Sequence, residues 1–356
     1  MINRKLKGRG AQLNPKNRFD KLYIEELEED QEYFDSDESK IIKVNTIFLK
    51  DNSRSIIAKN DSYDLDFNYS FNPYRGCEHG CVYCYARPTH EYLGFSSGID
   101  FETKIVIKEN AAELLEHEFK KKSYKPDVIM FSGNTDCYQP IERKFGITRK
   151  ALQVCLDYRN PVSIVTKNSL IERDIDILSE LAKLNLVSVL MSITTLDKKI
   201  TSTIEPRTST PERRLKTIEE LSKNNIPSGV NLAPVIPGLN DEEIPVILKE
   251  VHKHGGVFAR HSMIRLPYSV KDIFIEWVLR EFPDRSSKVL NKIREVHNGR
   301  LNESEFGKRF SGEGKFADTI NNLFELSCKK YHLNEKRMKL NVNLFRKLKN
   351  EQLEIF

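Results

Sequence analysis

Three cysteines fall within eight residues, at Cys77, Cys81 and Cys84, with the spacing C-x3-C-x2-C. A four-iron cube normally takes four thiolates, one on each iron. Three closely spaced thiolates therefore leave one iron open to a small molecule. Gly76 and Gly80 permit the tight backbone path that a loop around a cube needs. The spacing predicts an open-iron [4Fe–4S] cluster on this loop.

Zinc is the main alternative for these thiols. Structural zinc takes four ligands, typically from two C-x2-C units far apart in the chain, and here there is one triplet and no second pair. A fourth ligand would have to come from His79, His90 or Cys137, which leaves zinc open. A purely structural role is disfavoured, because apolar neighbours are scarce in the segment Cys-Glu-His-Gly-Cys.

Apolar runs alternate with amphipathic stretches through the middle of the chain. We expect strands at 66–71, 104–108, 127–132, 162–166, 187–194, 229–235 and 257–266, and helices at 110–122, 148–158, 171–184, 210–224 and 241–254. Such alternation favours a parallel sheet in an α/β fold. The number of repeats, with no G-x-G-x-x-G after a strand, indicates a full or partial (β/α) barrel of the TIM type. In such barrels the chemistry sits at the carboxyl ends of the strands.

The rest of the chain divides around this core. We expect an N-terminal arm at 1–60, partly disordered, a core barrel at 61–268 and a helical extension at 269–356. The arm carries basic residues first and an acidic stretch at 25–38, and the net charge of +5 permits a polyanionic partner without demanding one. No secretory signal and no membrane-spanning run are visible, so we expect a cytoplasmic protein without a membrane partner.

The cysteine loop carries a resemblance to a known family. With the aromatic Tyr83 just before the third cysteine, it resembles the signature of the radical S-adenosylmethionine (SAM) superfamily. The resemblance implies a partial (β/α)6 barrel in which the open iron chelates the methionine moiety of SAM. One electron then cleaves a C–S bond, and a 5′-deoxyadenosyl radical abstracts hydrogen from substrate. It also implies that Tyr83 contacts the adenine, and that the enzyme needs a low-potential electron donor of the flavodoxin or ferredoxin type.

Polar residues at two strand ends are candidates to bind the methionine part of SAM. The superfamily has a glycine-rich segment after the strand at 128–131, and Gly133, Thr135 and Asp136 occupy this place. An ordinary strand-to-loop turn would also explain these residues. Lys167 ends the strand at 162–166 and could pair with the carboxylate through a charge-assisted bond, although such a lysine is usually only solvated.

Further polar residues are candidates for the ribose and the carboxylate. Ser192 and Thr194 close a strand, where their hydroxyls could bind the ribose. Glu205 and Arg207 follow in a loop, either as a surface ion pair or with the arginine on the carboxylate of SAM. Asn231 interrupts an apolar strand, and a buried amide needs partners that a nucleotide would supply.

A closer resemblance is to the spore photoproduct lyase-like branch, related to DNA repair photolyases. It rests on the segments 81–87, 135–142 and 234–241. Spore photoproduct lyases carry a hydrogen-donating cysteine three residues before the aspartate of the strand-end turn, where this chain has Gly133. Cys137, one residue after Asp136, is a candidate catalytic donor, or else a small core residue. We therefore expect the cofactor chemistry to carry over and leave the substrate open, with nucleic acid or nucleotide as a candidate.

Two other functions remain open: a nucleic-acid-binding protein with a structural metal or cluster, and an iron–sulfur redox sensor. The segment 307–316 mixes glycine, basic and aromatic residues, which suits phosphate contacts and base stacking or a loop that caps the barrel. The polar strand ends favour an enzyme, because a structural metal would need none of them.

Overall fold

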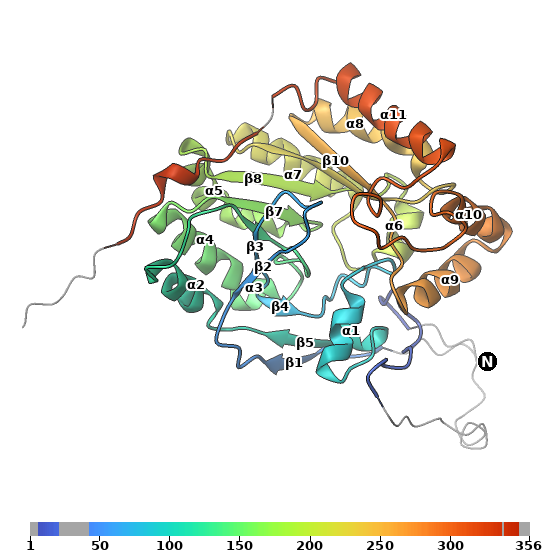
Figure 1. Ribbon diagram of the computed structural model, residues 1–356, viewed down its shortest axis with the longest axis horizontal. Coiled ribbons are helices and arrows are strands. Elements are labelled where there is room, and N and C mark those ends of the chain that lie inside the picture. The colour runs from blue at the N-terminus through green and yellow to red at the C-terminus, as the bar shows by residue number, and fades with distance from the viewer. Residues whose placement is uncertain (1–5, 21–42, 337, 349–356) are drawn as a thin grey trace, which may run out of the picture.

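The computed structural model describes residues 6–20, 43–336 and 338–348 (Figure 1). The acidic stretch at 25–38 lies outside the described residues. Within them, no helix is long and apolar enough to cross a membrane.

The main sheet has seven strands in the order β10-β9-β8-β7-β6-β3-β2. Its strands are β2 (Ile57–Lys59), β3 (Tyr69–Phe71), β6 (Ile129–Phe131), β7 (Val162–Thr166), β8 (Val187–Ser192), β9 (Ser228–Val235) and β10 (Phe258–Met263). Each neighbouring pair from β3 to β10 is parallel, and only β2 runs antiparallel to its neighbour β3. Six parallel strands alternating with helices confirm the predicted α/β fold of the partial-barrel type.

Helices cover the outside of this sheet (Figure 1). The helices at predicted positions are α2 (Ala111–Lys120), α4 (Ile147–Tyr158), α5 (Ile175–Lys183), α7 (Pro211–Lys223) and α8 (Ile244–Lys253). Short helices without a sequence prediction are α1 (Ile99–Thr103), α3 (Glu142–Phe145), α6 (Lys198–Ile204) and the 3-10 helix η2 (Arg87–Leu93). The 3-10 helices η3 (Ser169–Asp174) and η4 (Asp241–Glu243) lie at the starts of the predicted helices 171–184 and 241–254, and η5 (Val342–Leu344) lies in the predicted helical extension. Each long helix turns one apolar face to the core; α5, for instance, buries Ile177, Leu178 and Leu181.

Local sequence explains the best-defined elements. All six residues of β8 are buried, as expected for a central parallel strand covered on both faces. Helix α7 begins where predicted: Thr210 caps it by accepting a hydrogen bond from the N–H of Arg213, and Pro211 holds the first helical position.

One expected strand belongs elsewhere. The run at 104–108 forms β5 (Lys104–Ile107), which pairs with β1 (Ile47–Lys50) and β4 (Tyr74–Arg75) in a separate three-stranded sheet and not in the barrel. The apolar pattern of a strand does not specify its sheet, which explains the error. Because β4 follows β3 after only two residues, the chain crosses from the barrel into the small sheet just before the cysteines.

The C-terminal part adds α9 (Val270–Glu281), α10 (Pro283–Glu295) and α11 (Lys315–Lys330). Helix α11 lies beside α8 (Figure 1). Helices α9 and α10 build a second hydrophobic core that includes Trp277 and Phe274 together with Val82 and Tyr83 of the cysteine loop. The division of the chain at residues 60 and 268 stays a prediction, but parts from both sides of it contact the same loop.

Candidate cluster and cofactor site

The cysteine loop begins directly after β4, near the carboxyl end of β3. Cys77 anchors it by donating its N–H to the carbonyl of Phe101 (2.9 Å), and Val82 does the same to Ile204 (3.1 Å). Gly76 and Gly80 have φ values of 78° and 70°, a conformation that favours glycine. A Cβ at Gly76 would also lie 2.9 Å from the Phe101 carbonyl oxygen. The loop thus follows the tight path that the sequence predicts.

The three thiols of this loop are withdrawn from water. Cys77 and Cys81 are buried and Cys84 is half-buried. Burial raises the pKa of all three thiols, and at Cys81 the nearby ammonium of Lys167 acts against this rise. Thiols of this kind bind metal as thiolates, so a bound metal would displace their protons.

A buried carboxylate fixes the loop from behind. Glu102 accepts hydrogen bonds from Arg87 (2.5 Å) and from the backbone N–H groups of Gly10 (3.0 Å) and Ala11 (2.8 Å). Arg87 in turn donates from Nε to the carbonyl of Cys81 (2.9 Å). Sequence reasoning missed Arg87 and Glu102, and it treated the segment around Gly10 as part of a loose arm. Gly8 and Gly10 stand in the same charged segment, so no local signal in the sequence identifies Gly10 as the point of contact.

That close approach is specific to one glycine of the N-terminal segment. A Cβ added to Gly10 would lie 1.8 Å from the carbonyl oxygen of Gly80. Nothing lies within 4 Å of a Cβ at Gly8. Residues 6–17 therefore pack against the cysteine loop at Gly10, with Ala11 in the same core as Cys81 and Val82.

Asp136 is central to the polar strand ends. Its carboxylate accepts hydrogen bonds from the hydroxyl of Thr166 (2.8 Å) and the N–H of Lys167 (2.8 Å), and it lies 3.4 Å from Nδ1 of His79 in the cysteine loop. Burial acts to raise its pKa, but His79 together with hydrogen bonds from the backbone N–H groups of Lys167 and Tyr138 outweighs burial and lowers it. The structure thus brings Asp136 and Lys167 together beside the loop.

Tyr83, Thr194 and Glu205 form a buried cluster. The Tyr83 hydroxyl contacts the hydroxyl of Thr194 (3.1 Å) and donates to the carboxylate of Glu205. Glu205 also accepts from Thr194 (2.7 Å) and forms a buried ion pair with Arg214 (2.6 Å). Burial alone would raise the pKa of Glu205, but Arg214 and Lys167 lower it to about 2. Sequence reasoning missed Arg214, because in the amphipathic pattern of α7 it looks like any other charged residue.

The expected surface pair of Glu205 with Arg207 does not form. Arg207 instead pairs with Glu78 of the cysteine loop (3.1 Å), and its backbone N–H bonds to the carbonyl of His79 (3.3 Å). The physical reason is that the loop after α6 buries Glu205 against Arg214 and turns Arg207 toward the cysteines.

The remaining predicted residues differ in their hydrogen bonds and neighbours. Ser192 is buried, and its hydroxyl has no hydrogen-bond partner. Asn231 is its register partner on the neighbouring strand β9. The carbonyl of Gly133 accepts a hydrogen bond from the hydroxyl of Tyr85 (2.6 Å), and Thr135 uses its hydroxyl to hold the carbonyl of Tyr74 (2.7 Å).

Cys137 and the two histidines considered for zinc are each held by other contacts. Cys137 is fully buried in the main core, whereas Cys77 belongs to a small separate cluster with Ala86 and Phe101. His79 lies between Asp136 and Asn168, and His90 packs against Phe101. Among the residues the structure describes, no three His, Cys, Asp or Glu side chains are placed to share one metal ion. A cube spreads its three thiolates over three irons.

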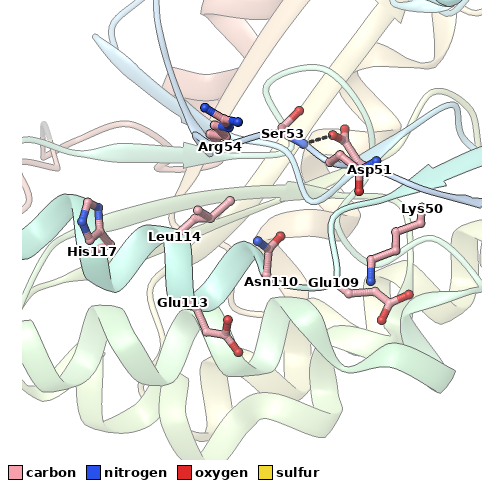
Figure 2. Close-up of a pocket in the computed structure, with 10 residues that line it drawn as sticks. Lys50, Asp51, Ser53, Arg54, Glu109, Asn110, Glu113, Leu114 and His117 are labelled. Carbon is pink, nitrogen blue, oxygen red and sulfur yellow. Dashed lines mark hydrogen bonds between the residues drawn. The ribbon is translucent and has the colours of Figure 1, made fainter.

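A cavity of about 650 Å³ lies elsewhere, between the end of β1 and the start of α2 (Figure 2). Its lining mixes basic side chains such as Lys50 and Arg54 with the acidic Glu109 and Glu113. None of the residues predicted to bind cluster or cofactor lines it. It is therefore not the candidate site.

Comparison with known proteins places this geometry in a family. The family model of the radical SAM superfamily matches residues 71–251, and the chain belongs to this superfamily. The chain resembles an uncharacterized protein of Mycobacterium tuberculosis, with 34% identity over 63% of this chain and 66% of that protein. An uncharacterized protein of Methanocaldococcus jannaschii is 33% identical over 49% of this chain and 63% of that protein. The chain thus spans a little under two thirds of these relatives.

The fold is similar to that of spore photoproduct lyase. A structure of that enzyme complexed with dinucleoside spore photoproduct superposes with a TM-score of 0.56 and 14% identity, covering 80% of this chain and 79% of the other. A variant with bound AdoMet and the same ligand gives 0.55 and 13%, over 80% and 78%. The predicted family is confirmed, and at this identity the likeness shows a shared fold alone.

The superfamily implies a [4Fe–4S] cluster, SAM and a source of reducing electrons. The residues present fit both groups. Three thiols on one tight loop, two buried and one half-buried, are the donor set of an open-iron cube. The unpartnered hydroxyl of Ser192 and the ammonium of Lys167, which lies 5.8 Å from the centre of the Tyr83 ring, are polar groups available to a nucleotide.

Proposed function

We propose that this enzyme reductively cleaves SAM at a [4Fe–4S] cluster held by Cys77, Cys81 and Cys84, and that the resulting 5′-deoxyadenosyl radical abstracts hydrogen from a substrate. One observation carries the proposal. Three thiols, two of them buried and one half-buried, lie on a single tight loop at the carboxyl end of a parallel barrel, in a member of the radical SAM superfamily.

The chain's own residues would divide the binding of SAM between them. Lys167, close enough to act on the pKa of Cys81, would pair with the methionine carboxylate, with Arg207 as a second cation. Asp136, Gly133 and Thr135 would bind the amino group, with Asp136 kept ionised by His79.

The nucleoside half of SAM would lie across the next strand ends. Ser192, whose hydroxyl lacks a partner, would bond the ribose, with Asn231 beside it on β9. Tyr83 would contact the adenine. Thr194 and Glu205 would act indirectly, because both fix the Tyr83 hydroxyl and so orient its ring.

The surroundings of the loop would exclude water from the reaction. Residues 6–17 cover it through Gly10 and Ala11, and α9 and α10 pack against Val82. Exclusion of water protects reactive intermediates from side reactions. A low-potential donor of the flavodoxin or ferredoxin type would supply the electron.

The substrate remains to be identified, with a nucleic acid or nucleotide as the candidate. We expect little or no reversal of spore photoproduct, because Gly133 replaces the donor cysteine and Cys137 is fully buried in the main core. Burial also raises the pKa of the Cys137 thiol. If Cys137 donates hydrogen, it must do so from this core position. Restored thymine in lesion-bearing DNA, lost in Cys137→Ala, would contradict this expectation.

The test is anaerobic reconstitution followed by product analysis. The protein should bind about four irons and four sulfides and form 5′-deoxyadenosine from SAM with dithionite. Cys81→Ala should lose both properties, whereas the matched variant Cys155→Ala, in a buried helix face, should keep them. A full cluster in Cys81→Ala would refute the assignment. A cluster without any 5′-deoxyadenosine would favour a structural metal or a redox sensor.

A further inference from the structure

The partial barrel has an open side between its two edge strands, and the C-terminal part of the chain crosses it. Residues 304–312, here called the seam loop, attach to β10 through the N–H of Met263, which donates to the carbonyl of Phe310 (2.8 Å). At the other edge of the sheet, Arg309 donates two hydrogen bonds of 2.7 and 2.5 Å to Asp64, which lies in the connection from β2 to β3. Arg260 and Asp66 form a second ion pair across the seam (3.3 Å).

Arg265 lies where the seam loop meets the barrel, two residues beyond β10. Its guanidinium is 6.0 Å from the ring centre of Tyr85 and 5.2 Å from that of Phe310. Its Nε is buried and has no hydrogen-bond partner. No carboxylate among the described residues pairs with it, because Arg309 engages both oxygens of Asp64. Burial and the neighbouring Arg309 lower the pKa of Arg265.

The same place adjoins the candidate cluster site. Tyr85 directly follows Cys84 in the sequence, and its hydroxyl reaches the carbonyl of Gly133 beyond β6. Tyr85 is 49% exposed, so part of this residue is accessible to a ligand. Arg265 therefore lies near the residue that follows the third cysteine, beside the candidate cluster site.

An unpaired, partly desolvated guanidinium favours an anion, and phosphate fits its planar fork in bidentate fashion. The seam adds aromatic rings to these cations: Phe306 is 41% exposed, and it packs on Tyr63 with ring centres 5.1 Å apart. Cations interleaved with exposed aromatic rings are typical of sites that bind nucleotides, where rings stack on bases. A carboxylate ligand would pair with the Arg265 guanidinium but would not stack on the aromatic rings.

We propose that Arg265 binds a phosphoryl group of the substrate, and that this substrate is a nucleotide unit whose base lies against Tyr85. Arg309 acts as a positioning residue, because it holds the seam loop on Asp64 and so places Phe310 over Arg265. This inference rests on the proposed function and assigns a substrate class to the same site. A free nucleotide and a nucleotide in a single strand present the same chemistry.

The experiment measures binding to anaerobically reconstituted, full-length protein by equilibrium dialysis. The probes are thymidine 5′-monophosphate, thymidine, a thymidylate hexamer and hexaglutamate. Arg265→Met should weaken binding of the monophosphate and the hexamer about ten- to a hundredfold, as expected for one charge-assisted contact. It should leave thymidine binding unchanged. Arg265→Lys should lose less, and Arg300→Met, an exposed arginine of the same region, should lose nothing.

Separate readouts keep this proposal distinct from the proposed function. Iron content and SAM affinity should be the same in Arg265→Met and in the unmodified protein. A hexamer that binds more tightly than the monophosphate would indicate a strand, and equal affinities would indicate a free nucleotide; either result supports the phosphoryl site.

Three results would overturn the proposal. The first is an equal loss of SAM affinity in Arg265→Met, which would place Arg265 in the cofactor site. The second is displacement of the monophosphate by hexaglutamate at equal concentration, which would indicate a carboxylate ligand. The third is no difference between Arg265→Met and Arg300→Met, or no binding of any phosphorylated probe. Failure of the unmodified protein to cleave SAM would instead refute the proposed function.

Discussion

Arg87 and Glu102 form a fully buried ion pair directly behind the cysteine loop, with Nη2 and Oε1 2.5 Å apart. Glu102→Gln would keep the shape of the side chain but leave the buried guanidinium without its counter-charge. Breaking a buried pair in this way costs about 3–5 kcal/mol. We expect a loss of that size in the free energy of unfolding, measured in urea on the cluster-free protein.

The matched control for this variant is Glu180→Gln. Glu180 pairs with Lys183 on the surface, where both side chains are more than half exposed. Exposed pairs contribute about 0–1 kcal/mol. Similar losses in the two variants would mean that the Arg87–Glu102 pair does not anchor the loop.

Gly10→Ala should displace the N-terminal segment from the cysteine loop. The added Cβ would meet the carbonyl oxygen of Gly80, a backbone atom that cannot turn aside as a side chain can. We expect faster hydrogen exchange and faster proteolysis in residues 6–17, together with a lower iron content after reconstitution. Gly8→Ala, where the new Cβ meets nothing, should cost only the strain of its φ of 70°, roughly 1 kcal/mol. Unchanged protection in Gly10→Ala would contradict the close packing.

Because of Glu205, the free energy of unfolding of the cluster-free protein should decrease at low pH. Its pKa is about 2 in the folded protein against an ordinary value of 4.5, because Arg214 and Lys167 outweigh burial. A depressed pKa adds stability that is present above pH 4.5 and is lost as the pH falls toward 2. The difference corresponds to about 3 kcal/mol. The free energy of unfolding, measured in urea at pH 6, 4 and 3, should differ less between the unmodified protein and Glu205→Gln as the pH falls. A difference that stays constant over this range would contradict this account.

Ser192→Ala should leave the stability of the protein unchanged or higher but should lower its affinity for SAM. The hydroxyl is buried without a partner, so its removal should leave stability unchanged or raise it by about 1 kcal/mol. SAM affinity should fall about two- to tenfold, the value of one neutral hydrogen bond. Ser188→Ala on the same strand removes a hydroxyl that donates to Ser163 (3.0 Å), so it should lower stability and spare SAM binding. Equal SAM affinity in both variants, by calorimetry, would place the ribose elsewhere.

The sequence was most informative where chemistry and periodicity are local. The spacing of Cys77, Cys81 and Cys84 predicted the loop, and the mostly apolar run of β8 predicted a central strand. Both signals depend on neighbours within a few residues, so no tertiary information was needed. The order of strands and helices was enough to predict the class of fold.

What the sequence did not disclose depends on contacts between distant segments. Glu102 bonds to Gly10, 92 positions away, and no local pattern distinguishes such a buried carboxylate from a surface one. Arg214 looks like one more charge on an amphipathic helix, yet it is almost fully buried against Glu205. The sequence favoured Arg207 as the partner of Glu205 because Arg207 is nearer in the chain. The fold instead pairs Glu205 with Arg214.

The seam between Asp64 and Arg309 joins residues 245 positions apart. Protein synthesis proceeds from the N-terminus, so the ribosome releases all three cysteines and every barrel strand before the seam loop exists. Until residues 304–312 emerge, the growing chain has the exposed Arg260–Asp66 pair across the seam but lacks Arg309, the residue that holds Asp64. The side of the barrel between β2 and β10 is therefore fastened only after all three cysteines and every barrel strand have been made.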